Sequence, residues 1–121
     1  MKHGKKGKKL SRERNQRRAL LKTMLGSLIM HEKITTTEAK AKELKRLIDP
    51  IINQAKKSLD EKKKVNVIRE LRTKLPLMAV KKITGNFINR FNSRRSGYTR
   101  LIKIAPRKND AAKMAIIEFI D

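Results

Sequence analysis

The stretch that decides the fold is "EAKAKELKRLIDPIINQA" (residues 38–55), which carries the clearest amphipathic pattern in the chain. Its apolar side chains recur three and four residues apart and form one helical stripe: Leu44, Leu47, Ile48, Ile51, Ile52 and Ala55. The helix is expected to begin near Thr37, either through a capping box of Thr35 with Glu38 or with Thr37 as the cap. Because Pro50 removes a backbone donor inside the stripe, a kink or a break is expected near Asp49.

An earlier helix is predicted from Ser11, which is a suitable N-cap. Its apolar residues also form one stripe: Leu20, Leu21, Met24, Leu25, Leu28 and Ile29. The first turns, "RERNQRR" (residues 12–18), carry charge before that stripe begins. This helix is therefore expected to start in contact with a partner and to end in the core.

Two further helices are predicted after the long one. The segment "DEKKKVNVIRELRTKL" (residues 60–75) has weaker amphipathicity, with Val65, Ile68 and Leu71 on its apolar side. Pro76 suits the first turn of the next helix, and Gly85 is either tolerated inside that helix or marks an irregularity in it. The side chains that this helix would bury are Val80, Ile83, Phe87 and Phe91.

Three short strands complete the prediction. The β-branched run at residues 33–36 favours a strand, and "YTRLIKIA" (98–105) and "MAIIEFI" (114–120) read as two strands joined by "PRKNDAAK". The expected fold class is α+β, with three to four helices packed on a small three-stranded mixed or antiparallel sheet. Residues 1–10, "MKHGKKGKKL", form an extended basic tail, and residues 11–121 form a single domain.

Charge is concentrated in two parts of the chain. The sequence holds 33 Lys and Arg against 11 Asp and Glu, which gives a net charge of +22. Residues 1–31 carry ten cations against Glu13 alone, and residues 71–109 carry eleven cations and no acid. Since two such segments repel each other without a counter-charge, the distribution predicts two regions that face a polyanion.

Other chemistries find little support. The chain lacks cysteine, and His31 with Glu32 begins a zinc-binding HExxH pattern whose second histidine is replaced by Thr35. The glycines of "GKKGKKL" follow no strand and lack the spacing of a phosphate-binding loop. No apolar run is long enough to span a bilayer. We therefore expect no enzyme, cofactor, metal or small-molecule substrate, no membrane contact and a cytoplasmic location.

The two basic regions each allow two interpretations. The tail is either a solvated, disordered charge run or an arm that becomes ordered along phosphates. In "NSRRSGYTR" (residues 92–100), the arginines suit phosphates, and Tyr98 either stacks on an unpaired base or packs at the edge of the domain. Gly97 is also explained by a simple turn.

The motifs "MKHGK", "GSLIMHEKITTT", "AKAKELKRLIDP" and "GYTR", in this order and spacing, closely resemble the family of the seventeenth protein of the bacterial large ribosomal subunit. The resemblance covers the first half and resumes from about Phe91, but Ser96 stands where the family tends to have a glycine. It implies an α+β structural protein bound to large-subunit ribosomal RNA near the rim of the peptide exit tunnel, beside neighbouring ribosomal proteins. The RNA-binding residues carried over are Lys2, His3, Lys5, Lys6, Lys8, Lys9, Arg12, Arg14, Arg17, Arg18, Arg94, Arg95, Tyr98 and Arg100.

Two other classes of protein fit the composition alone. A DNA-binding protein of the nucleoid would also be strongly basic, but the chain shows neither helix-turn-helix spacing nor a zipper. A protein of the membrane surface would need a basic amphipathic helix with interfacial aromatics, and the aromatic residues here are few.

Overall fold

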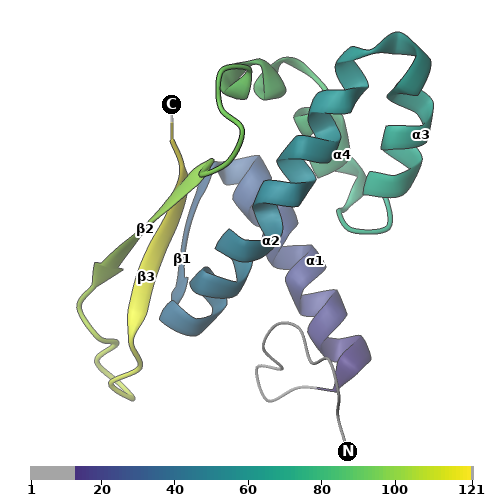
Figure 1. Cartoon of the computed structure of the whole chain (residues 1–121). Helices are drawn as coiled ribbons and strands as arrows, with labels where there is room; N and C mark the ends of the chain where they lie inside the picture. The colour runs from purple at the N-terminus through teal and green to yellow at the C-terminus, as the bar shows by residue number, and fades with distance from the viewer. Residues whose placement is uncertain (1–12, 121) are drawn as a thin grey trace, which may run out of the picture.

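The computed structural model describes residues 13–120 and has the predicted α+β fold (Figure 1). Its elements, in chain order, are α1 (Arg14–His31), β1 (Lys33–Thr37), α2 (Glu38–Lys56), the 3-10 helix η1 (Lys57–Leu59), α3 (Glu61–Leu71), α4 (Leu77–Ile83), the 3-10 helix η2 (Asn86–Phe91), β2 (Thr99–Ile104) and β3 (Met114–Phe119). The predicted tail and the proposed cap Ser11 lie outside the described residues. Helix α1 itself begins at Arg14, later than expected, and Glu13 before it makes no side-chain cap hydrogen bond.

The sheet is antiparallel throughout, with the strand order β1-β3-β2. The central strand β3 buries Ala115, Ile117 and Phe119 on one face, as its alternating pattern predicts. The pairs Ile34↔Ile117 and Leu101↔Ile117 place residues of both edge strands on that same face. The sheet therefore offers one apolar face to the helices.

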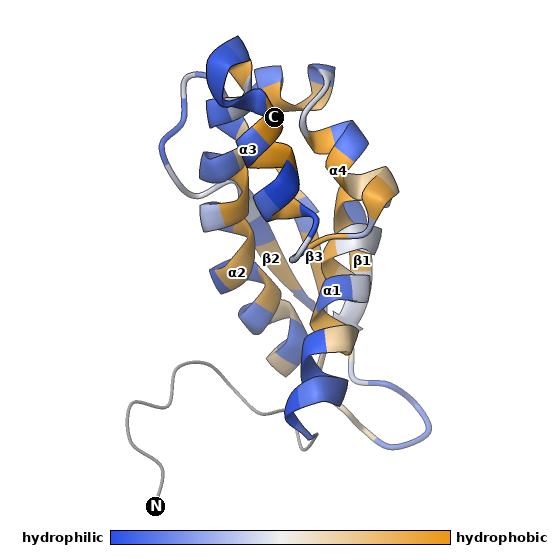
Figure 2. Cartoon of the chain, turned by 90° about the vertical axis from the view of Figure 1, so that its right-hand side faces the viewer, coloured by the Kyte–Doolittle hydropathy of each residue, from blue (hydrophilic) through white to orange (hydrophobic). Residues whose placement is uncertain are grey.

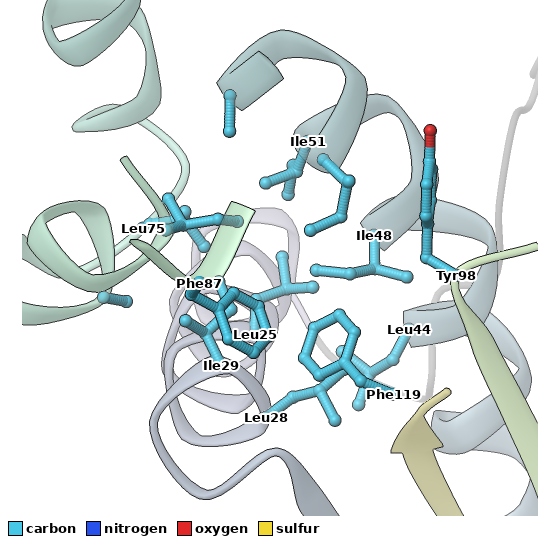
Figure 3. Close-up of a cluster of buried hydrophobic side chains, with 14 of the residues drawn as sticks. Leu25, Leu28, Ile29, Leu44, Ile48, Ile51, Leu75, Phe87, Tyr98 and Phe119 are labelled. Atoms are coloured by element: carbon cyan, nitrogen blue, oxygen red, sulfur yellow. The ribbon is translucent and has the colours of Figure 1, made fainter. Parts of the chain in front are cut away.

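The helices α1 and α2 cover that face, and α3 and α4 pack against them beyond one end of the sheet (Figures 1 and 2). Figure 3 shows Leu28 of α1, Leu44 and Ile48 of α2, and Phe119 of β3 meeting in the core. Leu28, Leu44 and Ile48 are fully buried. The stripes predicted for the first two helices are thus the surfaces on which the domain is built.

Helix α2 continues through Pro50, so the predicted break is wrong. Pro50 is exposed, while Ile48, Ile51 and Ile52 around it are buried. Burial of a leucine-sized or isoleucine-sized side chain contributes roughly 1.5–3 kcal/mol, and a proline inside a helix costs about 3 kcal/mol. Several buried side chains therefore outweigh one lost hydrogen bond.

Helix α2 begins after Thr37, which is one of the two N-caps that the sequence predicts. Thr37 is the N-cap, without a side-chain cap bond, while the backbone N–H of Glu38 donates to the carbonyl of Lys113 at 2.8 Å. The capping box at Thr35 is wrong, because Thr35 lies inside β1 and pairs with Ile116.

The apolar side of α3 differs from the prediction. The predicted Leu71 is buried and the predicted Ile68 is half-buried against the core, but Val65 is 65% exposed and Val67 is buried instead. The helix is capped by Asp60, whose Oδ1 accepts the backbone N–H of Lys62 at 3.0 Å. The face of α3 that packs in the core therefore carries Val67, Ile68 and Leu71, and Val65 lies to the side of it.

The single helix predicted after Pro76 is two helices. Pro76 is the N-cap of α4, which ends at Ile83, and Gly85 precedes η2. Gly85 therefore marks the irregularity, which was one of its two expected roles. Both helices face the core, since all four predicted side chains are buried: Val80, Ile83, Phe87 and Phe91.

Candidate nucleic-acid interface

The first turns of α1 present arginines to solvent. Arg14 and Arg18 are exposed and Arg17 is half-buried, whereas Leu25 and Leu28 further along are buried. Figure 2 shows the hydrophilic start of the helix leading into its apolar part. The predicted core end of this helix is confirmed, and the partner contact of its exposed start stays a prediction.

These arginines line a cleft of about 450 Å³ between α1, α2 and the turn that follows α3. Its cations are Arg14, Arg17, Arg18, Lys22 and Lys74. Its apolar walls are Leu21, Leu25, Leu47, Pro50 and Ile51. No acidic residue of the described chain lines the cleft, and none forms an ion pair with Arg14, Arg18, Lys22 or Lys74.

Sequence reasoning did not single out Lys22 and Lys74. Lys22 interrupts the apolar stripe of α1, and Lys74 belongs to the acid-free segment 71–109. Both signals are visible in the sequence, but only the packing of the turn after α3 against α1 brings the two lysines to one cleft.

The second predicted basic region is the turn between η2 and β2. Arg95 is exposed and Arg94 is half-buried. Arg100, on β2, donates to Glu118 Oε1 at 2.8 Å, so part of its charge is neutralised within the sheet. Arg94 and Arg95 are therefore the stronger phosphate candidates of this region.

Tyr98 is fully buried, which corrects its assignment as a base-stacking residue. Its ring packs edge-on against Phe91 at 5.3 Å between centroids, and Figure 3 shows it lying along α2. The hydroxyl accepts from Lys56 Nζ at 2.8 Å and also contacts Asn53 Oδ1. Because no face of the ring is open to a base, the packing interpretation is the one that fits.

Helix α2 also holds the backbone of this turn. The carboxylate of Asp49 accepts the N–H of Gly97 at 3.1 Å and that of Tyr98 at 3.4 Å. Gly97 has a φ of +66°, which glycine adopts without strain. Ser96 is not among the described residues with positive φ, so the loss of a family glycine there leaves this turn intact.

The two basic regions lie on opposite sides of α2. Leu47, Pro50 and Ile51 line the cleft, whereas Asp49, Asn53 and Lys56 hold the turn. At 3.6 residues per turn, these two sets point in nearly opposite directions from the helix axis. In Figure 1 the start of α1 and the turn before β2 are correspondingly far apart.

Several cations near the sheet, in contrast, have acidic partners. Glu38 pairs with Lys42 at 3.0 Å and with Lys103 at 3.6 Å, and the hydrogen bond from Lys42 lowers the pKa of Glu38. Arg107 binds Asp110 through two hydrogen bonds, of 3.0 and 2.8 Å, and lowers the pKa of that carboxyl to about 2. Around the cleft, by contrast, Arg14, Arg18, Lys22 and Lys74 have no acidic partner among the described residues.

Half of the predicted RNA-binding residues precede Glu13, the first described residue. Those that lie outside the described residues are Lys2, His3, Lys5, Lys6, Lys8, Lys9 and Arg12. Arg12 directly precedes the described chain, so the tail joins the domain at the end of α1 that borders the cleft.

A small basic α+β domain in which one cleft gathers cations and no described acid is typical of the class of proteins that bind a polyanion. No helix in the described part of the chain is long and apolar enough to cross a membrane. Residues 20–120 match the family model described as ribosomal protein L17.

Three relatives carry the name "Large ribosomal subunit protein bL17", and each match covers the whole of this chain. The relative from Chloroherpeton thalassium is 43% identical over 121 residues, which span 69% of its length. Those from Chlorobium chlorochromatii and Pelagibacter ubique are 41% and 43% identical, with 76% and 81% of their lengths covered. The chain belongs to the ribosomal protein L17 family, and it is a structural ribosomal protein and not an enzyme.

Proposed function

We propose that this protein, as a structural constituent of the large ribosomal subunit, binds ribosomal RNA through two basic surfaces. The first is the basic tail together with the arginines at the start of α1, and the second is the turn that carries Arg94 and Arg95. A place in the ribosome gives the protein a cytoplasmic location, as the sequence predicts.

The observation that carries this proposal is the cleft at the start of α1. Four of its cations, Arg14, Arg18, Lys22 and Lys74, have no acidic partner among the described residues, whereas Arg100, Lys103 and Arg107 at the sheet and its connection do. Bringing four like charges together is costly unless a polyanion neutralises them. The phosphates of RNA supply that counter-charge.

The family resemblance supports two finer parts of the proposal: a position near the rim of the peptide exit tunnel, and contacts with neighbouring proteins of the large subunit. Chemical crosslinking of assembled subunits tests both, because lysine crosslinks identify neighbouring proteins and RNA crosslinks locate the protein on the subunit.

The decisive experiment is sedimentation of cell extract through a sucrose gradient at moderate salt. Co-migration with the large subunit is expected. Recovery with chromosomal DNA would instead favour a nucleoid protein, and recovery with membranes would favour a protein of the membrane surface.

A double variant tests the second surface. We expect Arg94→Ala with Arg95→Ala to weaken RNA binding for all RNA sequences alike. The slope of log K against log salt concentration should become shallower by up to about 1.8, since each phosphate contact contributes roughly 0.9 to it. The matched control is Lys103→Ala with Arg107→Ala, which removes two cations that already have acidic partners. A defect confined to one RNA sequence, or an equal defect in the control, would contradict the proposed role.

A further inference from the structure

We infer that the cleft between α1 and α2 receives one unpaired nucleotide of RNA, with the base against the apolar wall and the flanking phosphates on the cationic rim. This inference rests on the proposed function and names the RNA feature that the surface takes. It follows from three properties of the cleft: its size, the separation of its polar and apolar parts, and its charge.

The size fits a single small ligand group. Clefts that bind small molecules range from roughly 300 to 1,000 Å³, and this one holds about 450 Å³. A base with its sugar is a small-molecule ligand on that scale. A base-paired helix is about twice as wide as a single nucleotide, so a duplex rests on the rim and does not enter the cleft.

The lining separates into two parts. Leu25 and Ile51 are buried at the base of the cleft, Leu21 and Leu47 are half-buried in its wall, and Pro50 is exposed at its edge. A surface that bound only phosphates would not need this apolar wall. An extruded base supplies a flat, weakly hydrated face that matches it.

The positive charge of the cleft favours a nucleotide over the other possible occupants. Arg14, Arg18, Lys22 and Lys74 surround the apolar wall and have no acidic partner among the described residues. An apolar segment of a protein would bury these cations without compensation. The chain's own basic tail would add like charge. A nucleotide provides an apolar face and an anionic backbone in one group.

The test compares two short RNA hairpins, equal in charge, one with a single unpaired 2-aminopurine in its stem and one fully paired. The full-length protein is expected to bind the bulged RNA roughly five- to tenfold more tightly, because one face of the base is removed from water against the aliphatic wall. Because no aromatic side chain among the described residues lines the cleft, 2-aminopurine emission should rise on binding and not be quenched.

Two kinds of variant separate the wall from the rim. Leu47→Gln and, at the exposed edge, Pro50→Gln should each remove the preference for the bulge and leave binding of the paired RNA unchanged. Lys22→Gln with Lys74→Gln should weaken binding of both RNAs. Ile104→Gln is the control, because it changes an exposed apolar residue of the sheet that does not line the cleft.

The outcomes distinguish this inference from the proposed function. Equal affinity for bulged and paired RNA, both with a steep salt dependence, would overturn the inference and leave RNA binding intact. A preference that appears only after deletion of residues 1–12 would also overturn it, because the tail would then be the occupant. If the protein binds neither RNA more tightly than it binds heparin, the proposed function itself is contradicted.

Discussion

Glu32 shows how one residue joins three elements. It ends α1 in the left-handed conformation, with a φ of +66°, and its N–H donates to the carbonyl of Leu28 at 2.7 Å. That conformation costs a non-glycine residue roughly 1–2 kcal/mol. The carboxylate offsets this cost by accepting from Lys82 of α4 at 3.0 Å and from Arg90 of η2. A glycine would adopt the turn without strain but would not tie these elements together.

Glu32→Gln is therefore expected to reduce the pH dependence of stability. Hydrogen bonds from Lys82 and then Arg90 lower the pKa of Glu32 from its usual 4.5. Its contribution is fully present above about pH 4.5 and is lost as the pH falls through the lower pKa of the folded state. The effect is modest, since the side chain is 41% exposed.

Urea unfolding of both proteins between pH 2 and pH 7 checks this expectation. The curves should differ at neutral pH and converge at the acid end. Glu32→Gly provides the comparison, because it removes the same charge but also relieves the backbone conformation, so it should be more stable than Glu32→Gln. A constant difference at every pH would show that Glu32 acts only through packing.

Tyr98 supports the second basic surface indirectly. We expect Tyr98→Phe to lower the free energy of unfolding by about 1–2 kcal/mol, because Asn53 and Lys56 of α2 lose their shared hydrogen-bond partner. Chemical denaturation measures this loss. An unchanged stability would mean that the hydroxyl does not hold the turn of Arg94 and Arg95 against α2.

At the scale of elements, the contact between α1 and α4 depends on a residue without a side chain. A Cβ added at Gly26 would lie 2.7 Å from Cγ of Pro76 and 2.8 Å from its Cδ. Gly26 itself is buried in the middle of α1. The helix therefore accepts a poor helix former so that the start of α4 packs closely against it.

Gly26→Ala should destabilise the domain by about 1 kcal/mol. Overpacking costs roughly 1–3 kcal/mol, and alanine returns up to about 1 kcal/mol of helix propensity. Helix propensity alone predicts that Gly26→Ala stabilises the domain. The sign of the change in unfolding free energy therefore decides between propensity and overpacking. In the Pro76→Ala background the same substitution should become neutral or stabilising, and thermal or urea unfolding of the four proteins completes this double-mutant cycle.

Helical periodicity in the sequence predicts the buried faces of the two long helices correctly. The stripes of α1 and α2 are long, and the residues at their centres are buried as predicted. The prediction for α3 chose Val65, whereas Val67 is buried, because Val67 shares one helical face with Ile68 and Leu71 and Val65 lies to the side of that face. The break at Pro50 failed because the tertiary burial around the proline outweighs its local cost.

At the scale of the whole molecule, the charge is divided by location. The ion pairs of Glu38, Asp110 and Glu118 lie at the sheet and at the connection between β2 and β3, and no described acidic residue lines the cleft. Deletion of residues 1–9 should therefore weaken RNA binding. It should also make the slope of log K against log salt concentration shallower by up to about 4.5, because five lysines are removed.

The same deletion should leave thermal unfolding almost unchanged, since the core of the described residues begins at Leu25, with Leu21 and Met24 packed against it. Filter binding at several salt concentrations and a melting curve measure the two effects separately. A large drop in melting temperature would show that residues 1–9 pack in the fold.

The sequence alone determined the class of fold, the two acid-poor regions and the family, because periodicity, charge and motif order are properties of the linear chain. Tertiary structure alone decided the roles of particular residues. It buried Tyr98, paired Arg100 with Glu118, and brought Lys22 and Lys74 to one cleft. The physical reason is that burial and ion pairing depend on what a neighbouring element places opposite a side chain, and residues far apart in sequence supply those neighbours.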